Sequence, residues 1–319
     1  MLAADSLRKQ GLKVEISVYD VDQQERKVSA VLQKPEMKKM DLIVGPFFKN
    51  SFAIAADFAR SNKIPIVNPL SSRPDILEDN PFVCKPVPSV ESQPGIVARL
   101  VERDYRDHKV MLYVANQFQN SEMILKLKEA IENADPAGLR KVTIVDFSAD
   151  SIQGFKRYAA FGKQNLVIIY ADNEVLPAAL LSKLTVMKED YGITVLGLPE
   201  WEKFTNLETI YLIALNAILL TDSYIDADEE HTKAFIRSYR ERYFDEPMHF
   251  AFMGFDAGYF FLKGLADYDG NFMRCLPECR IPLTQNQFYF EKTSSGGYDN
   301  LNWNVLQYYD YYLIKKSLY

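Results

Sequence analysis

Short apolar runs alternate with stretches of helical spacing along most of this chain, and this alternation limits the folds that it can adopt. Three runs in the first part of the chain, residues 14–20, 41–45 and 64–68, are predicted strands. Between the last two, residues 52–59 carry apolar side chains at positions i, i+3, i+4 and i+7, which predicts a helix with one apolar stripe. Continuous apolar strands separated by helices are typical of parallel sheets covered on both faces, so we expect βαβ units.

The same alternation resumes after residues 85–89, a Pro-rich segment that cannot lie in a central strand or a helix interior. Further strands are predicted at residues 109–115, 142–146, 166–170 and 193–197, with helices between them. A length of 319 residues favours two domains at about 150 residues each. The predicted fold class is therefore α/β, with two Rossmann-like, doubly wound lobes.

The end of the chain has a different pattern. Helical spacing is present from residue 232 to 243 and again from 256 to 265. Residues 287–291, a Gly-containing turn and residues 305–314 then predict a terminal hairpin.

Composition excludes several classes of partner. The formal net charge is −6, which argues against a nucleic-acid partner, because such a partner requires a surface that neutralises phosphates. The longest apolar run, residues 210–220, contains Asn216 and is shorter than the roughly 20 residues needed to cross a bilayer, so we expect no membrane span in this chain.

No sequence motif indicates catalysis. Phosphate-binding glycine loops, the nucleophile elbow and the paired histidines of zinc proteases are all missing from the sequence. The spacing of Cys84, Cys275 and Cys279 does not fit a metal site, although Cys275 and Cys279 could form a disulfide in an oxidising compartment. We therefore expect a non-enzymatic protein with no catalytic residues, metal or cofactor.

Polar and small residues follow the predicted strands, where open α/β sheets bind their ligands. They occur in the segments 45–51, 68–73, 116–120, 171–174 and 197–201. Asn50 or Ser51 can cap the helix that follows, whose N–H groups would then face an anion. Each such residue could instead be an ordinary cap or turn residue.

The order of several segments resembles that of a known family. These segments are 41–46, 64–72, 82–86, 170–174, 197–201, 223–226, 235–243 and 253–257. Together they resemble the type I periplasmic binding protein superfamily, and in particular its branched-chain amino acid receptors. The resemblance implies three strands crossing between the lobes, near residues 84–90, 222–228 and 282–290, and a ligand held between lobes by hinge closure. Lobe 1 would comprise residues 1–86 plus 225–284, and lobe 2 residues 87–224 plus 285–319.

The resemblance also implies a ligand site. Hydroxyl and N–H groups near Ser51, Ser71 and Ser72 would bind an amino-acid ligand, and Asp172 or Glu174 would meet its ammonium group. The full set of expected ligand-binding residues is Ser51, Asn68, Ser71, Ser72, Asn116, Asp172, Glu174, Trp201 and Asp256.

Two features depart from the family pattern. Phe47, Phe48 and Lys49 occupy a loop that is usually small and rich in hydroxyl groups. The chain also begins within the first helix, so we expect the first strand of lobe 1 to be missing and the chain to be a fragment of a longer gene product.

The expected function is a non-catalytic, extracytoplasmic domain that closes on a small polar ligand such as an amino acid or short peptide. The chain is also similar to envelope proteins that join this domain to a peptidoglycan-binding module, and to lipoprotein activators of penicillin-binding proteins. The alternative is therefore an envelope scaffold or regulator with a degenerate cleft, acting through protein or peptidoglycan-linked contacts. Both alternatives imply a periplasmic or cell-envelope location, and the second implies an envelope protein partner.

Overall fold

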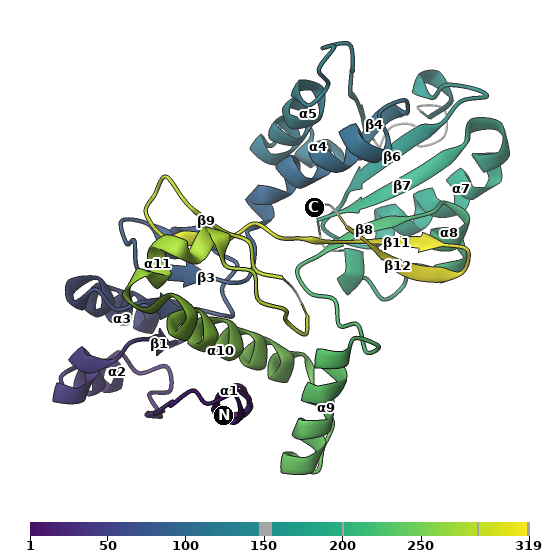
Figure 1. Ribbon diagram of the computed structural model, residues 1–319. Coiled ribbons are helices and arrows are strands. Elements are labelled where there is room, and N and C mark those ends of the chain that lie inside the picture. Colours follow the sequence, from purple (N-terminus) through teal and green to yellow (C-terminus); the bar gives the residue numbers. More distant parts are fainter. Residues whose placement is uncertain (147–154, 200, 286, 318–319) are drawn as a thin grey trace. The chain divides into compact units, whose positions relative to one another are not determined.

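The computed structural model describes residues 1–146, 155–199, 201–285 and 287–317. Two compact units form, one from residues 1–89 and 222–302, the other from residues 90–221 and 303 onward. Each unit contains its own sheet of mostly parallel strands (Figure 1). This arrangement confirms the predicted α/β class.

The sheet of unit 1 has five short strands in the order β1-β2-β3-β10-β9. The strands are β1 (Ile43–Val44), β2 (Ile66–Val67), β3 (Val83–Lys85), β9 (Phe290–Lys292) and β10 (Tyr298–Asn300). β1, β2, β3 and β10 run parallel, and β9 runs antiparallel to β10. Because Pro46, Pro65 and Pro69 flank β1 and β2 and cannot donate to a ladder, these strands stay short.

The helices of unit 1 are α1 (Leu2–Lys9), α2 (Glu25–Leu32), α3 (Lys49–Asn62), α9 (Glu230–Tyr243), α10 (His249–Tyr268) and α11 (Phe272–Cys275), with 3-10 turns η1 (Pro35–Lys39), η2 (Pro74–Leu77), η6 (Asp269–Asn271) and η7 (Leu276–Glu278). These helices pack through apolar side chains, α3 and α10 against the sheet and others against these two helices. The predicted stripe of α3, including Phe52 and Ala59, is buried against Ile66 and Val83. The structure therefore confirms the expected helix over residues 52–59.

The sheet of unit 2 has seven strands in the order β12-β11-β8-β7-β6-β4-β5. The strands are β4 (Lys109–Val114), β5 (Thr143–Asp146), β6 (Asn165–Tyr170), β7 (Ile193–Leu198), β8 (Ile218–Thr221), β11 (Asn304–Tyr309) and β12 (Tyr312–Lys316). The five strands β4, β5, β6, β7 and β8 run parallel, and β11 runs antiparallel to both β8 and β12. The helical elements are η3 (Val90–Ser92), α4 (Gln93–Asp104), η4 (Asn116–Phe118), α5 (Glu122–Asn133), α7 (Val175–Tyr191), η5 (Trp201–Lys203) and α8 (Thr209–Ala214).

Two sequence predictions about strands are wrong. Residues 14–20 form no strand, because no strand among the described residues pairs with them, and Ile16 and Val18 are exposed. The terminal hairpin is also wrong, because residues 290–300 form a hairpin that joins β3 in unit 1, whereas β11 and β12 join β8 in unit 2. Residues 287–302 consequently belong to unit 1, and the third passage of the chain between units follows Asn302 rather than lying at residues 282–290.

Parts of some predicted segments lie outside the described residues, namely residue 200 in the segment 197–201, residue 286 in the crossing 282–290 and residues 318–319 in lobe 2. None of the described helices is long and apolar enough to span a membrane. The three cysteines are free thiols, so the structure does not contain the possible bond between Cys275 and Cys279. The described residues include no cluster of three or more His, Cys, Asp or Glu side chains suited to a metal ion.

Candidate functional site

The carboxyl edge of the unit 1 sheet brings together the loops that follow β1, β2 and β3, because these strands are parallel. Asn68 is buried between the first two loops. Its Oδ1 accepts the N–H groups of Leu70 (3.1 Å) and Ser71 (3.2 Å), and its Nδ2 donates to the Phe47 carbonyl (3.4 Å). The Asn68 amide therefore holds the two loops in position beside the sheet.

The first turn of α3 lies directly after the β1 loop and has the features of an anion subsite. The prediction that Asn50 or Ser51 caps this helix is wrong, because the helix begins at Lys49 and both residues lie within its first turn. The N-cap residue is Phe48, which supplies no side-chain hydrogen bond to the helix N-terminus. Ser51 in this turn is only 1% exposed, and its Oγ has no hydrogen-bond partner among the described residues. Unpaired N–H groups and the positive end of a helix dipole favour a negative group, and the Ser51 hydroxyl is an additional donor.

The loop after β2 combines polar and apolar groups. Ser71 Oγ accepts the Arg73 N–H (3.3 Å), and Ser72 is exposed. Asp75 forms ion pairs with Arg73 (2.6 Å) and Lys49 (3.2 Å), and the hydrogen bond from Arg73 is the main reason that the pKa of Asp75 falls to about 2. This loop therefore presents hydroxyl groups beside an occupied ion-pair cluster.

Apolar side chains are exposed at the same edge. Phe47 and Phe48 are each 49% exposed, and Leu70 is 43% exposed. Because these residues belong to the loops that follow β1 and β2, an apolar part of a ligand could contact them there.

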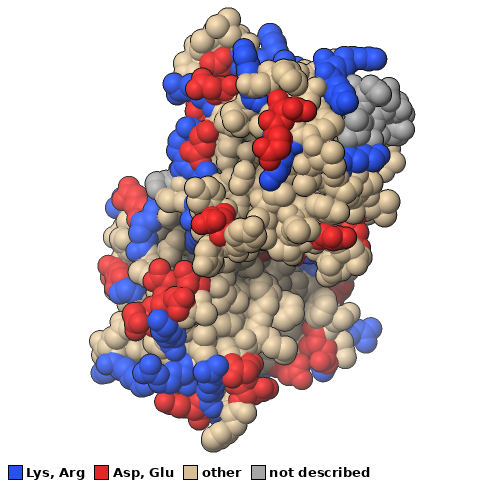
Figure 2. Space-filling view, turned by 90° about the vertical axis from the view of Figure 1, so that its right-hand side faces the viewer, with Lys and Arg blue, Asp and Glu red and all other residues tan. Residues whose placement is uncertain are grey.

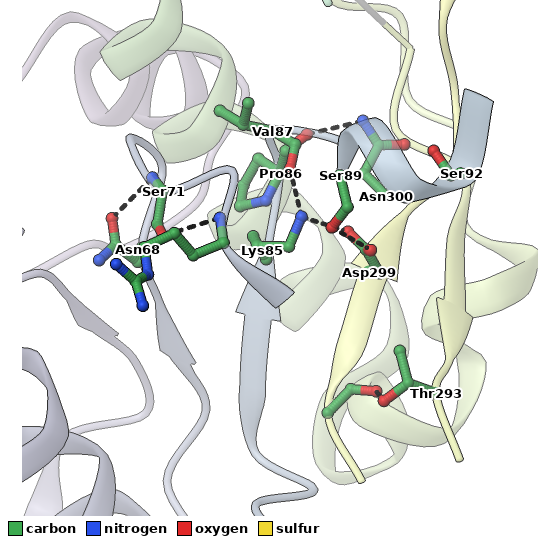
Figure 3. A network of polar contacts seen from close by, with 12 residues as sticks. Asn68, Ser71, Lys85, Pro86, Val87, Ser89, Ser92, Thr293, Asp299 and Asn300 are labelled. Atoms are coloured by element: carbon green, nitrogen blue, oxygen red, sulfur yellow. Dashed lines mark hydrogen bonds and ion pairs between the residues drawn. The ribbon is translucent and has the colours of Figure 1, made fainter. Parts of the chain in front are cut away.

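A buried ion pair supports the loop after β3, and sequence reasoning missed it (Figure 3). Lys85 is completely buried, and its Nζ lies 2.6 Å from Asp299 Oδ1 and donates to the Val87 carbonyl (2.6 Å). Ser89 Oγ donates to Asp299 Oδ2 (2.9 Å), and Asn300 Nδ2 donates to the Pro86 carbonyl (2.7 Å). These bonds fasten the loop after β3 to the end of β10.

A small cavity of about 30 Å³ lies in unit 1 beside this network, with Pro86, Val87, Asp222, Asp256 and Gln285 among its lining residues. A cavity of that size has room for a water molecule, roughly, and not for an amino acid. It is therefore not itself the ligand-binding surface.

Asp256, one of the expected ligand residues, is buried in the wall of this cavity. Its Oδ1 accepts the N–H and hydroxyl of Thr284 (2.8 Å each), and its Oδ2 accepts the N–H of Gln285 (2.8 Å). Burial outweighs these hydrogen bonds and raises the pKa of Asp256 to about 6. The carboxyl group therefore joins α10 to the segment at 284–285.

The carboxyl edge of the unit 2 sheet is acidic and aromatic. Asp172 follows β6, is exposed and accepts a hydrogen bond from Asn173 (2.8 Å). The Tyr170 ring is in edge contact with Phe118, with ring centroids 5.8 Å apart. Burial raises the pKa of Tyr170, and the negative charges of Asp172 and Glu91 raise it further. Carboxylates beside aromatic rings are suited to an ammonium group.

The other expected residues of unit 2 have different surroundings. Glu174 accepts the N–H groups of Thr205 and Asn206 (3.1 Å each), so it fixes that loop to the start of α7. Trp201 is buried, and its ring packs so closely on Gly197 that an added Cβ there would lie 2.1 Å from it. Asn116 begins η4, and its side chain lies outside the described residues. Of the unit 2 candidates, Asp172 is thus the one with an exposed carboxylate.

The charged surface does not favour a polyanion on the face shown in Figure 2. Lys and Arg side chains lie beside Asp and Glu side chains over that face. The mixture agrees with the net charge of −6.

Comparisons with solved structures show the same fold. A putative branched-chain amino acid ABC transporter protein from Rhodospirillum rubrum is 14% identical, with a TM-score of 0.69 and coverage of 99% of this chain and 92% of that one. An ABC transporter substrate-binding protein from Desulfitobacterium hafniense in complex with Leu is 14% identical, with a TM-score of 0.56 and coverage of 99% and 93%. LpoA from Haemophilus influenzae is 14% identical, with a TM-score of 0.60, and here 99% of this chain covers 55% of that chain.

A search of curated proteins finds no match. Residues 1–272 match the sequence model of the family described as periplasmic binding protein. This match spans most of the chain and agrees with the two-unit α/β fold and with the solved structures. The chain therefore belongs to the periplasmic binding protein family.

Proposed function

We propose that this chain is a non-catalytic, extracytoplasmic domain that binds a small zwitterionic ligand of the amino-acid class. The observation that carries the proposal is the difference in chemistry between its two sheet edges. Unit 1 offers an uncapped helix N-terminus with the buried Ser51 hydroxyl, whereas unit 2 offers the exposed Asp172 carboxylate beside Tyr170. An amino acid carries a carboxylate suited to the edge of unit 1 and an ammonium group suited to the edge of unit 2.

In this proposal the ligand carboxylate accepts hydrogen bonds at the first turn of α3, with Ser51 and Ser71 as hydroxyl donors. Its ammonium group meets Asp172, and an apolar side chain contacts Phe47, Phe48 and Leu70, which are exposed. Hinge closure of the two units on the ligand is part of the proposal. The Leu-bound structure from D. hafniense, which shares the fold, supports an apolar amino acid as the first ligand to test.

Titration calorimetry with leucine, isoleucine and short peptides tests this function. Ser51→Ala and Asp172→Asn each remove one charge-directed hydrogen bond, so affinity should fall about tenfold or more. Asp57→Asn is the matched control, because Asp57 is exposed on α3 and bonds to Arg60 (3.1 Å), outside the two edges. Unchanged affinity in both test variants would refute the assigned residues.

A second candidate is an envelope scaffold whose cleft has lost its ligand. It is favoured by the fold shared with LpoA and by the exposed Phe47 and Phe48 in a loop that the family resemblance implies to be rich in hydroxyl groups. In that case an envelope partner should remain bound after Ser51→Ala and Asp172→Asn, and calorimetry should detect no amino acid. Loss of the partner on these two substitutions would count against a scaffold role.

A further inference from the structure

The outer edge of the unit 2 sheet is a short, uncovered strand. β12 ends the strand order and pairs only with β11 within the residues that the structure describes (Figure 1). Both of its faces carry exposed side chains, since Tyr312 is 71% exposed, Leu313 36% and Ile314 40%. Exposed apolar edge strands are templates for pairing with another strand.

The register of the β11–β12 hairpin determines which backbone groups of β12 point outward. Tyr309 pairs with Tyr312 across a turn of two residues, Asp310 and Tyr311, which both have positive φ. Such a turn makes Tyr309 and Tyr312 a hydrogen-bonded pair, and bonding then alternates along the strands. Tyr312, Ile314 and Lys316 consequently direct their backbone groups toward β11. Leu313 and Lys315 direct theirs away from the sheet.

We propose that β12 is an interface with a second copy of this chain, formed by antiparallel pairing of the two β12 strands about a two-fold axis at Ile314. In this register the outward N–H and C=O groups of Leu313 and Lys315 bond to those of Lys315 and Leu313 in the second copy. All five residues of β12 are paired, and the contact closes as a symmetric dimer.

The side chains of β12 are self-complementary in this register. Ile314 faces Ile314, Tyr312 faces Lys316, and Leu313 faces Lys315 of the other copy. No lysine faces another lysine, and the apolar residues and the tyrosine cover the lysine stems. Self-complementarity is the reason for choosing a second copy rather than an unrelated strand as the occupant.

The edge is also held in place before any pairing. Lys316 forms an ion pair with Asp104 (2.7 Å) and lies over the Tyr105 ring, and Arg103 donates to the Ser317 carbonyl. Because α4 thus anchors the end of β12, little ordering is required when the second strand pairs.

Sedimentation analysis of the whole chain over a concentration series tests the interface. The protein should show a monomer–dimer equilibrium. Ile314→Lys places two lysines opposite each other at the axis, so the dissociation constant should rise about tenfold or more. Leu313→Glu places a carboxylate opposite Lys315, so dimerization should persist or strengthen. Val186→Lys, at a residue of α7 that is 83% exposed, is the control and should leave the equilibrium unchanged.

Disulfide trapping tests the register. A pair of residues at the axis that is not hydrogen-bonded has Cβ atoms within reach of a disulfide, so Ile314→Cys should give a covalent dimer under mild oxidation. Tyr312→Cys should not, because it faces Lys316. A chain that is monomeric at every concentration, or equal trapping of the two cysteine variants, would overturn the proposal. Dimerization that Ile314→Lys leaves intact would place the interface elsewhere and would overturn it as well.

Discussion

Lys85→Met should destabilise unit 1 more than any surface charge substitution in that unit. Lys85 is completely buried, and its ammonium group lies 2.6 Å from Asp299 Oδ1. Methionine fills a similar volume but leaves the Asp299 carboxylate buried, with the Ser89 hydroxyl as a remaining donor. Breaking a buried ion pair from one side costs about 3–5 kcal/mol, and loss of the bond to Val87 adds about 1 kcal/mol.

The assay is urea unfolding followed by circular dichroism and by fluorescence, so that separate unfolding of the two units is detected. Lys263→Met is the matched control, because its ion pair with Asp267 (2.9 Å) is partly exposed on α10 and contributes about 0.5 kcal/mol or less. Adding Asp299→Asn to Lys85→Met removes the charge of the buried carboxylate, so the free energy of unfolding should recover by at least about 2 kcal/mol. A loss for Lys85→Met no larger than that for Lys263→Met, or no recovery in the double variant, would refute the reasoning.

Three further predictions concern other parts of the structure. The pKa of Asp256 is raised from 3.8 to about 6, so the stability contributed by its protonated form is complete below about pH 4 and is lost as pH rises through 6. Urea midpoints should show a loss of up to about 3 kcal/mol over this pH range in the wild type and not in Asp256→Asn, and parallel pH profiles of the two proteins would contradict the prediction. Gly197→Ala puts a Cβ 2.1 Å from the Trp201 ring and should cost about 1–3 kcal/mol with a changed near-ultraviolet spectrum, whereas an unaltered spectrum and midpoint would show that the ring can move away. Arg73→Ala should raise the pKa of Asp75 from about 2 toward 3.8 in an NMR titration, and an unchanged value would assign the depression to Lys49.

The sequence predicts the parallel cores well because burial is visible locally. Residues 166–170 are a continuous apolar run, residues 193–197 are apolar apart from Thr194, and the two segments form the central strands β6 and β7. The segment 14–20 has an equally plausible strand pattern, but a strand requires a partner, and pairing is decided by distant residues. For the same reason, local turn signals near residues 294–297 could not show that β9 and β10 join β3 while β11 joins β8.

Topology determines which residues lie at the edges of the two sheets. Parallel strands bring the residues after β1, β2 and β6 there, which is why the positions of Ser51, Ser71 and Asp172 could be predicted, whereas their roles in binding stay predictions. Packing was not predictable, and it is packing that buries Trp201 against Gly197 and engages Asp256 with Thr284. Lys85 was missed because a lysine is rarely buried, although its position in a strand directly after Val83 and Cys84 is a usable signal.

The most direct test of the proposed function is thermal unfolding of this chain with leucine and with two analogues, one lacking the carboxylate and one lacking the amine. A ligand that binds only the folded state raises Tm as its concentration rises. We expect a rise with leucine that is much smaller with either analogue, because each sheet edge then loses its group. No rise with leucine or other amino acids, or an equal rise with all three compounds, would contradict a two-edged site for a zwitterion.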